Sequence, residues 1–173
     1  MLYHSTRSQA VLIDGAQAVL NGLAPDGGLY VPQEIPKLDV EAILRENTME
    51  MATRIIGAML PAIPEMETLV RRAYTGKFES DELTPTVDTG KFTVLELFRG
   101  PTSAFKDVAL CMLPQLLTKA KSVKGMQEDI LILTATSGDT GKAALAGFQD
   151  VEGVRICVFY PHGGVSKVQR AQM

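Results

Sequence analysis

The sequence has no long hydrophobic run, no excess of positive charge and no cluster of metal-ligating side chains. Of its 173 residues, 46% are hydrophobic and 21% are charged, and the formal net charge is -3. A chain with this charge offers no electrostatic footprint for nucleic acid or for an anionic membrane surface, so we exclude both as partners. No apolar segment is long enough to span a bilayer. The composition is typical of a soluble globular protein with one or two domains.

The chain is also poor in cysteine and histidine. It contains only Cys111, Cys157, His4 and His162, and their spacing is not that of a metal site. Both cysteines lie in apolar surroundings, which predicts buried thiols in a reducing compartment and no disulfide. The amino terminus lacks the charged start, apolar centre and cleavage site of a signal peptide. We therefore expect a cytoplasmic protein without a bound metal.

The pattern of apolar residues changes near residue 92. Residues 41–59 and 65–75 both have helical apolar spacing, and two prolines separate them. Residues 1–92 are therefore predicted to form a small, mainly helical amino-terminal domain. Residues 93–173 are predicted to form the beginning of a second domain with a different architecture.

Strands and helices alternate after residue 92. The expected strands are 91–97, 129–135 and 154–160, and the expected helices are 107–121 and 140–148. Strands that are apolar on both faces and are joined by helices predict a parallel sheet covered on both sides, with ligands at the carboxyl ends of the strands. The fold class is therefore α/β, with an incomplete β-α-β parallel sheet. Pro114 is expected to kink the first helix or to delay its start.

One polar loop, TATSGDTG, joins a predicted strand to a predicted helix. The hydroxyl groups of Thr136, Ser137 and Thr140, together with free backbone N–H groups of the loop, would face the place where an anion binds. The loop lacks the glycine and the Ser or Thr of a Walker loop, which disfavours nucleotide hydrolysis. A second interpretation is that Asp139 or Thr140 only caps the helix, and the loop alone leaves both open.

A further short helix is predicted near the carboxyl end. Ser166 and Gln169 have the S-x-x-Q spacing of a capping box, in which each residue bonds the other's backbone N–H. This segment follows the predicted strand 154–160, so the helix would begin the next crossover of the sheet.

Lys106 lies in the segment LFRGPTSAFKDVAL, between a predicted strand and a predicted helix. The dipole at a helix amino terminus disfavours a positive charge and so favours the neutral amine. A neutral amine can form a Schiff base with an aldehyde. A lysine with its charge in water is the commoner case, and spacing alone does not overturn it.

Four separated motifs together resemble threonine synthases, in the same order and over nearly the whole chain. They are YHSTR with NGLAPDGGLYVP, GPTSAFKD, TATSGDTGKAA and YPHGGVSKVQRAQM. This family consists of pyridoxal-phosphate (PLP) enzymes of the tryptophan-synthase-β type, which convert O-phosphohomoserine and water to threonine and phosphate. The resemblance implies a PLP-dependent carbon–oxygen lyase that acts on a phosphate, with a small-molecule substrate. It also makes residues 1–92 the accessory domain of the family.

The resemblance also assigns roles to residues. Lys106 would hold the cofactor as an internal aldimine and act later as acid and base, and Phe105 would help to set its position beside the ring. The loop residues that would bind the substrate α-carboxylate and lie near the 3-oxygen of the cofactor are Thr136, Ser137, Asp139 and Thr140. The carboxylate of Asp139 would repel that of the substrate unless it is protonated or turned aside, and the sequence leaves this open.

Members of the family continue well beyond the length of this chain, and their glycine-rich loop for the cofactor phosphate lies in that later part. We therefore expect an amino-terminal portion with little or no activity alone, and both a monomer and a homodimer remain open. The candidates near the right loops for binding the substrate phosphate are Lys142, Lys167 and Arg170. A solvated helix side chain is the commoner role for each of them.

Three alternatives remain at this stage. The first is a threonine-synthase-like enzyme that acts on phosphohomoserine only by elimination. The second is a non-catalytic binding protein with the same fold. The third is a sister PLP enzyme such as threonine dehydratase or cysteine synthase, and the STR and GLAPDGGLYVP segments argue against it because the resemblance ties them to threonine synthases.

Overall fold

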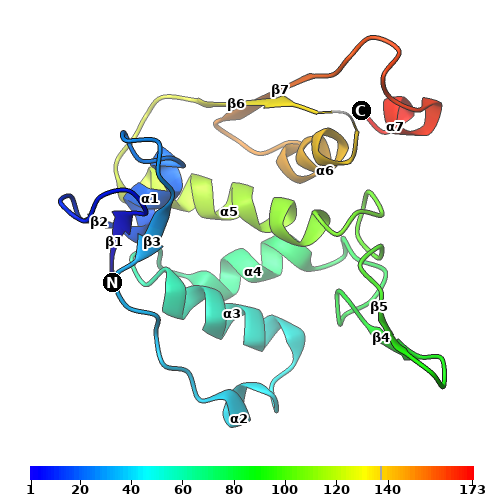
Figure 1. Ribbon diagram of the computed structural model, residues 1–173, viewed down its shortest axis with the longest axis horizontal. Helices are drawn as coiled ribbons and strands as arrows, with labels where there is room; N and C mark the ends of the chain where they lie inside the picture. The colour runs from blue at the N-terminus through cyan, green and yellow to red at the C-terminus, as the bar shows by residue number, and fades with distance from the viewer. Residues whose placement is uncertain (137) are drawn as a thin grey trace. The chain divides into compact units, whose positions relative to one another are not determined.

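The computed structural model describes residues 1–136 and 138–173 (Figure 1). The chain forms two compact units: the first contains residues 1–71 and 116–127, and the second contains residues 72–115 and 128–173. Helices and small sheets occur together, so the α/β class is confirmed. The domain boundary near residue 92 remains a prediction.

The first unit contains a three-stranded antiparallel sheet that the sequence analysis did not predict. Its strands are β1 (Leu2–Ser5), β2 (Ile13–Asp14) and β3 (Tyr30–Pro32), with β1 in the centre. These strands are two to four residues long, too short for an alternating pattern to appear in the sequence. Asp26 ties the PDGG turn to the sheet, because its Oδ1 accepts hydrogen bonds from Ser5 Oγ at 2.7 Å and from the Gly28 N–H at 2.9 Å.

The helices of the first unit differ from the prediction in one place. They are α1 (Gly15–Asn21), α2 (Val40–Ile43), α3 (Thr48–Met59) and the beginning of α4 (Met66–Tyr74). The single helix predicted over 41–59 is wrong, because a new helix starts after Asn47. The Asn47 side chain accepts a hydrogen bond from the Glu50 N–H at 3.0 Å, and Glu50 Oε2 accepts one from the Asn47 N–H at 3.1 Å. This capping box satisfies free backbone donors and defines the start of α3.

The second unit contains a β-hairpin where the sequence analysis predicted the first strand of the parallel sheet. β4 (Thr86–Asp88) pairs antiparallel with β5 (Thr93–Leu95). The predicted role of 91–97 in the parallel sheet is therefore wrong. The turn explains the difference: Gly90 has a φ of 82°, and Asp88 Oδ1 accepts a hydrogen bond from its N–H at 2.7 Å. A glycine with positive φ allows the chain to reverse sharply between two short strands.

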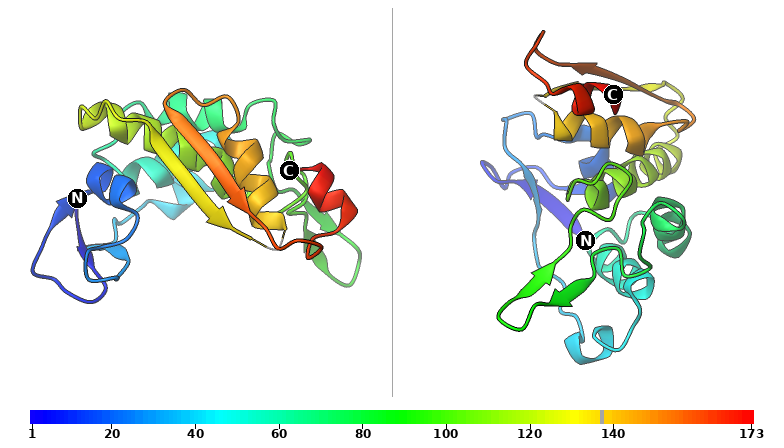
Figure 2. Two further views of the ribbon diagram at one scale, coloured as in Figure 1. Left: turned by 90° about the horizontal axis from the view of Figure 1, so that it is seen from above. Right: turned by 90° about the vertical axis from the view of Figure 1, so that its right-hand side faces the viewer.

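The predicted β-α-β unit is confirmed further along the chain. β6 (Ile130–Ala135) and β7 (Val154–Phe159) are parallel neighbours, and α6 (Asp139–Phe148) connects them. Figure 1 and both views of Figure 2 show α6 on one side of this strand pair. The carboxyl end of β6 therefore leads directly into the amino-terminal turn of α6.

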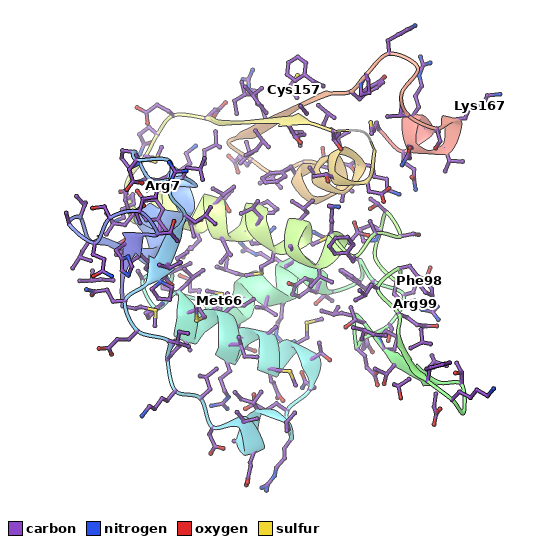
Figure 3. All side chains as sticks on the ribbon, viewed as in Figure 1. Arg7, Met66, Phe98, Arg99, Cys157 and Lys167 are labelled. Carbon is purple, nitrogen blue, oxygen red and sulfur yellow. The ribbon has the colours of Figure 1, made fainter. Side chains whose placement is uncertain are left out.

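The opposite face of the β6–β7 pair is exposed in the described part of the chain. This face carries Leu131, Leu133 and Phe159, whose exposed fractions are 58–64%. The alternate residues of both strands, which point to the other face, are half-buried. The prediction that these strands are covered on both faces is therefore wrong for this chain, because α6 covers only one face. Cys157 belongs to the exposed face, as its position in Figure 3 shows, so the prediction of a buried thiol is wrong for Cys157. It holds for Cys111, which is buried.

Helix α5 (Asp107–Val123) starts where the sequence predicts, with Pro114 in its interior. Its amino-terminal part contacts α6 through Gly147: a Cβ atom on Gly147 would lie 2.1 Å from the Leu110 carbonyl oxygen. Only a residue without a side chain allows this approach. The second unit ends with α7 (Lys167–Ala171), and the predicted capping box between Ser166 and Gln169 is confirmed.

Candidate functional site

Lys106 immediately precedes α5, and its side chain is half-buried. Its Nζ atom lies 4.5 Å from the centroid of the Phe105 ring, which is itself 61% exposed. Among the residues that the structure describes, no carboxylate lies within ion-pair distance of this amine. The amine is therefore held near an aromatic face and remains available to a ligand.

Asp107 anchors the loop that carries Lys106. Its side chain is 1% exposed and accepts hydrogen bonds from Thr102 Oγ1 at 2.6 Å, from the Thr102 N–H at 2.8 Å and from the Ala104 N–H at 3.4 Å. Gly100 packs so closely that a Cβ atom there would lie 2.5 Å from Asp107 Oδ2. A buried carboxylate that accepts several hydrogen bonds at the start of a helix is a favourable arrangement. Asp107 thus fixes the loop against the first turn of α5.

The roles of Asp107 and Thr102 are not visible in the sequence. Their roles depend on the turn between them, in which Ser103 has a φ of 54°. No spacing rule for helix caps covers a carboxylate that reaches five residues back to a threonine. The motif GPTSAFKD contains both residues, and only the folded loop shows that they bond to each other.

The first turn of α5 is also held by Tyr74 at the end of α4. The Tyr74 hydroxyl donates a hydrogen bond to the Val108 carbonyl at 3.0 Å, and the side chain is 4% exposed. Burial, with a smaller contribution from Cys111, raises the pKa of Tyr74 to about 12. Phe78 packs edge-to-face on the same ring, with the centroids 5.8 Å apart. Tyr74 is therefore a neutral, buried support for the residues next to Lys106.

The loop before α6 has the strand-to-helix geometry that the sequence predicts. Thr136 belongs to it: its N–H donates to the Phe159 carbonyl at 2.9 Å, and its Oγ1 accepts a hydrogen bond from the Gly138 N–H at 3.1 Å. Asp139 is the first residue of the helix and Thr140 the second, and Thr140 is half-buried. Ser137 lies outside the described residues, so its predicted role is not placed.

The interpretation that Asp139 or Thr140 only caps α6 is wrong. The N-cap position is occupied by Gly138, with a φ of 154°, and no side chain of residues 1–136 or 138–173 makes a capping hydrogen bond there. A helix has free N–H groups in its first turn, and in the part of the chain that the structure describes no side-chain cap satisfies them here. The end of α6 therefore resembles the helix termini that bind anions.

Asp139 interacts with two other side chains instead. Lys142 Nζ lies 3.2 Å from Asp139 Oδ1, and Gln169 Nε2 donates to the same oxygen at 3.4 Å. The hydrogen bond from Lys142, and to a smaller extent the one from Gln169, holds the pKa of Asp139 below its usual value. The positive charge of Lys106 also lowers this pKa. The carboxylate is therefore ionised near neutral pH, which answers the question that the sequence left open.

The three positively charged candidates differ in their surroundings. Lys142 is only 8% exposed and pairs with Asp139, so it is not a solvated helix side chain. Lys167 and Arg170 are exposed, and Figure 3 shows Lys167 directed away from α7. The D-x-x-K spacing of Asp139 and Lys142 is a signal that sequence analysis could have used. The contact of Gln169 with Asp139, thirty residues earlier, had no such signal.

The segment between β5 and the Lys106 loop is held by a cluster around Arg99. Its guanidinium pairs with Glu96 at 2.6 Å and with Glu79 at 2.9 Å, and its Cζ lies 5.3 Å from the centre of the Phe98 ring. Figure 3 labels Phe98 and Arg99 side by side in this segment. These contacts fix the chain just before Gly100, where the Lys106 loop begins.

Metal and membrane sites were also predicted to be absent. Within residues 1–136 and 138–173, no three side chains of His, Cys, Asp or Glu are arranged to hold a metal ion. In the same part of the chain, no helix combines the length and the apolar character needed to cross a membrane.

Comparison with known proteins relates the chain to one family. Residues 2–74 match the family model described as "Threonine synthase N terminus". Threonine synthase of Pseudomonas aeruginosa is 40% identical over 180 residues, which cover 100% of this chain and 38% of that protein. Threonine synthase-like 2 of mouse is 34% identical over 180 residues, which cover 100% of this chain and 37% of that protein. The crystal structure of PLP-bound threonine synthase from Brucella melitensis superimposes with a TM-score of 0.90 at 41% identity, over 100% of this chain and 38% of that one.

The matches to these threonine synthases cover the chain from end to end, but the chain spans only about 38% of the length of the relatives. Both the sequence identity and the fold similarity are well above the level that shows only a shared architecture. The resemblance first seen in four sequence motifs is therefore confirmed, and it concerns the amino-terminal portion of these proteins.

Proposed function

We propose that this chain, which matches the amino-terminal portion of threonine synthases, supplies the cofactor lysine and the carboxylate-binding helix end of a PLP-dependent lyase. The reaction would convert O-phospho-L-homoserine and water to L-threonine and phosphate. One observation carries the proposal: the Lys106 amine of the GPTSAFKD motif is half-buried, lies 4.5 Å from the centroid of the Phe105 ring and has no carboxylate within ion-pair distance among the described residues.

The residues present fit a lysine-bound aldehyde cofactor. The Lys106 amine is partly accessible, has no carboxylate partner within the described residues and is held over the exposed face of Phe105. Asp107 and Tyr74 fix the backbone on its carboxyl-terminal side. Lys106 would therefore bind the cofactor, which when bound supplies an electron sink for negative charge at the substrate Cα. The loop for the cofactor phosphate is not identified in this chain.

Lys106 would serve a second purpose once the substrate amine has taken its place. A tethered neutral amine near neutral pH can accept a proton from one carbon and return it to another. Lys106 would thus remove the proton at Cα and exchange protons at Cβ and Cγ. Its fixed backbone limits the positions that the amine can reach, and this orientation favours proton transfer to carbons.

The substrate α-carboxylate would bind at the amino terminus of α6. The free N–H groups of its first turn donate to anions, and the hydroxyl groups of Thr136, Ser137 and Thr140 belong to the same loop. Asp139 would contribute through its position rather than through a direct contact, because its carboxylate is already bound by Lys142 and Gln169. Residues 1–92 would form the accessory domain, and the protein would act in the cytoplasm as a monomer or a homodimer.

Borohydride trapping tests the role of Lys106. The protein is incubated with pyridoxal phosphate, reduced and digested, and the pyridoxyl-labelled lysine is located by mass spectrometry. We expect the label on Lys106, its loss in Lys106→Arg, and no change in Lys91→Arg, which replaces an exposed lysine of the β4–β5 hairpin. Label spread over many lysines of the full-length protein would contradict the assignment.

Phosphate release and threonine formation from O-phosphohomoserine test the reaction itself. We expect both activities in the full-length protein and neither in its Lys106→Ala variant. The 173-residue chain alone should have little or no activity, since it spans only about 38% of the length of its relatives. Threonine formation by the isolated chain would contradict this expectation.

A second candidate function, which the sequence left open, is an enzyme that acts on phosphohomoserine only by elimination. The mouse relative is named threonine synthase-like 2 rather than threonine synthase, at 34% identity over 180 residues. Product analysis separates the two candidates, because an enzyme that only eliminates phosphate releases phosphate without forming threonine.

A further inference from the structure

Lys142 is a buried cation next to the proposed carboxylate site. Its side chain is 9% exposed, whereas that of its partner Asp139 is 55% exposed, and the two atoms Nζ and Oδ1 are 3.2 Å apart. A buried ammonium group is strongly disfavoured without a partner, and the Asp139 carboxylate provides that partner for Lys142. The pair brings together a negative charge, which would repel an anionic substrate, and the positive charge that cancels it.

Gln169 fixes the direction of the Asp139 carboxylate. Its Oε1 accepts a hydrogen bond from the Ser166 N–H at 3.0 Å, which orients the amide so that Nε2 donates to Asp139 Oδ1. The amide also lies against the N-cap of α6, because a Cβ atom on Gly138 would be 2.3 Å from Gln169 Nε2. Gln169, which is held by the capping box of α7, therefore binds the Asp139 carboxylate close to the N-cap of α6.

We infer that Lys142 is a positioning residue that neutralises Asp139 and so allows the amino terminus of α6 to bind the carboxylate of the substrate. This inference rests on the proposed function. Lys142 does not bind the substrate phosphate in this arrangement, since its amine is buried against Asp139. Without it, the ionised carboxylate of Asp139 would face an incoming anion with no compensating charge.

The kinetics of Lys142→Met and Asp139→Asn in the full-length protein test the inference. Methionine keeps the length of the side chain and removes its charge, and we expect the KM for O-phosphohomoserine to rise about tenfold with a nearly unchanged kcat. Asparagine removes the negative charge and keeps a side-chain oxygen that can accept a hydrogen bond from Lys142, so the KM of this variant should stay the same or fall. The double variant, which has neither charge, should return to within about threefold of the wild type.

A purely structural role for the pair predicts a different result. Both single variants would then impair the protein in the same direction, and added salt would not change the effect. Repulsion between charges is screened by salt, so the KM of Lys142→Met should approach that of the wild type as salt is raised. Calorimetric titration with L-threonine, which also carries the carboxylate, gives a readout independent of turnover, and its Kd should follow the same order.

The outcomes separate this inference from the proposed function. If the wild type forms no threonine from O-phosphohomoserine, the proposed function fails and the inference falls with it. If the wild type is active and the KM of Lys142→Met is unchanged, only the inference is wrong. If Lys142→Met does not fold, Asp139→Asn and the double variant carry the test, and a raised KM in both refutes the inference.

Discussion

Replacement of Asp107 gives the largest expected change in stability among the substitutions around the Lys106 loop. Asp107→Ala removes two short hydrogen bonds to Thr102 and a longer one to Ala104, and Thr102 is itself 4% exposed. A hydrogen bond to a charged group contributes about 1.5–3 kcal/mol, and buried donors left without a partner add to the loss. The free energy of unfolding should therefore fall by about 3–5 kcal/mol in Asp107→Ala.

Asp107→Asn should lose much less, about 1 kcal/mol. Its amide oxygen can accept from the Thr102 N–H, and its NH₂ group can donate to Thr102 Oγ1, because a hydroxyl group both donates and accepts. The matched control is Asp88→Ala, which removes a 2.7 Å bond to the Gly90 N–H in the exposed hairpin, and its loss should stay below about 1 kcal/mol.

Urea unfolding followed by far-UV circular dichroism measures all three variants. We expect Asp107→Ala to lose the most stability, and Asp107→Asn and Asp88→Ala to lose much less. If Asp107→Ala is no less stable than Asp88→Ala, the carboxylate does not hold the loop, and the account of how Lys106 is fixed is refuted.

The remaining predictions concern glycine, tyrosine and asparagine positions. Gly147→Ala should lower the free energy of unfolding by about 2 kcal/mol or more, since its Cβ would lie 2.1 Å from the Leu110 oxygen. Gly57→Ala in α3 should raise it by about 0.5–1 kcal/mol, because its Cβ would make only ordinary 3.7 Å contacts with Met66. Thermal unfolding of both variants compares them. The raised pKa of Tyr74, about 12 against 10.0, means that the stability it contributes is complete below pH 10 and is lost as the pH rises towards 12. The advantage of the wild type over Tyr74→Phe in urea should therefore shrink across that range. Asn47→Ala should cost about 1 kcal/mol through the start of α3, measured by the same unfolding assay.

Each of these expectations has a result that would contradict it. Equal effects of the two alanine substitutions at glycine would mean that α6 can move away from α5. A constant gap between wild type and Tyr74→Phe above pH 10 would mean that Tyr74 ionises in the folded protein as readily as in the unfolded one. An Asn47→Ala variant as stable as the wild type would show that packing alone sets the start of α3.

Elements with strong local signals could be predicted from the sequence. The β6-α6-β7 unit follows from apolar runs and a polar loop, and the start of α7 follows from the spacing of Ser166 and Gln169. The strands β1, β2 and β3 could not be predicted, because they are too short to show a period and are held by pairing across the sheet. The same holds for β5, whose partner is decided by the turn at Gly90.

The candidate site was predicted in part. The motifs identify Lys106 and the loop before α6, because each lies in a short segment with a distinctive sequence. The side chains that hold these residues were missed, since Asp107 bonds to Thr102 through a folded turn and Gln169 reaches Asp139 from another helix. Contacts of this kind depend on tertiary structure and leave no pattern along the chain.

The exposed face of the β6–β7 pair has a consequence for handling the chain in solution. A pair of strands has two outer edges, so both β6 and β7 offer unpaired backbone groups to another molecule. Leu131, Leu133 and Phe159 place an apolar surface beside those edges. Molecules of the isolated chain are therefore expected to adhere to one another as the concentration rises. Spectra of the isolated chain should therefore be compared at several concentrations, to separate single molecules from aggregates.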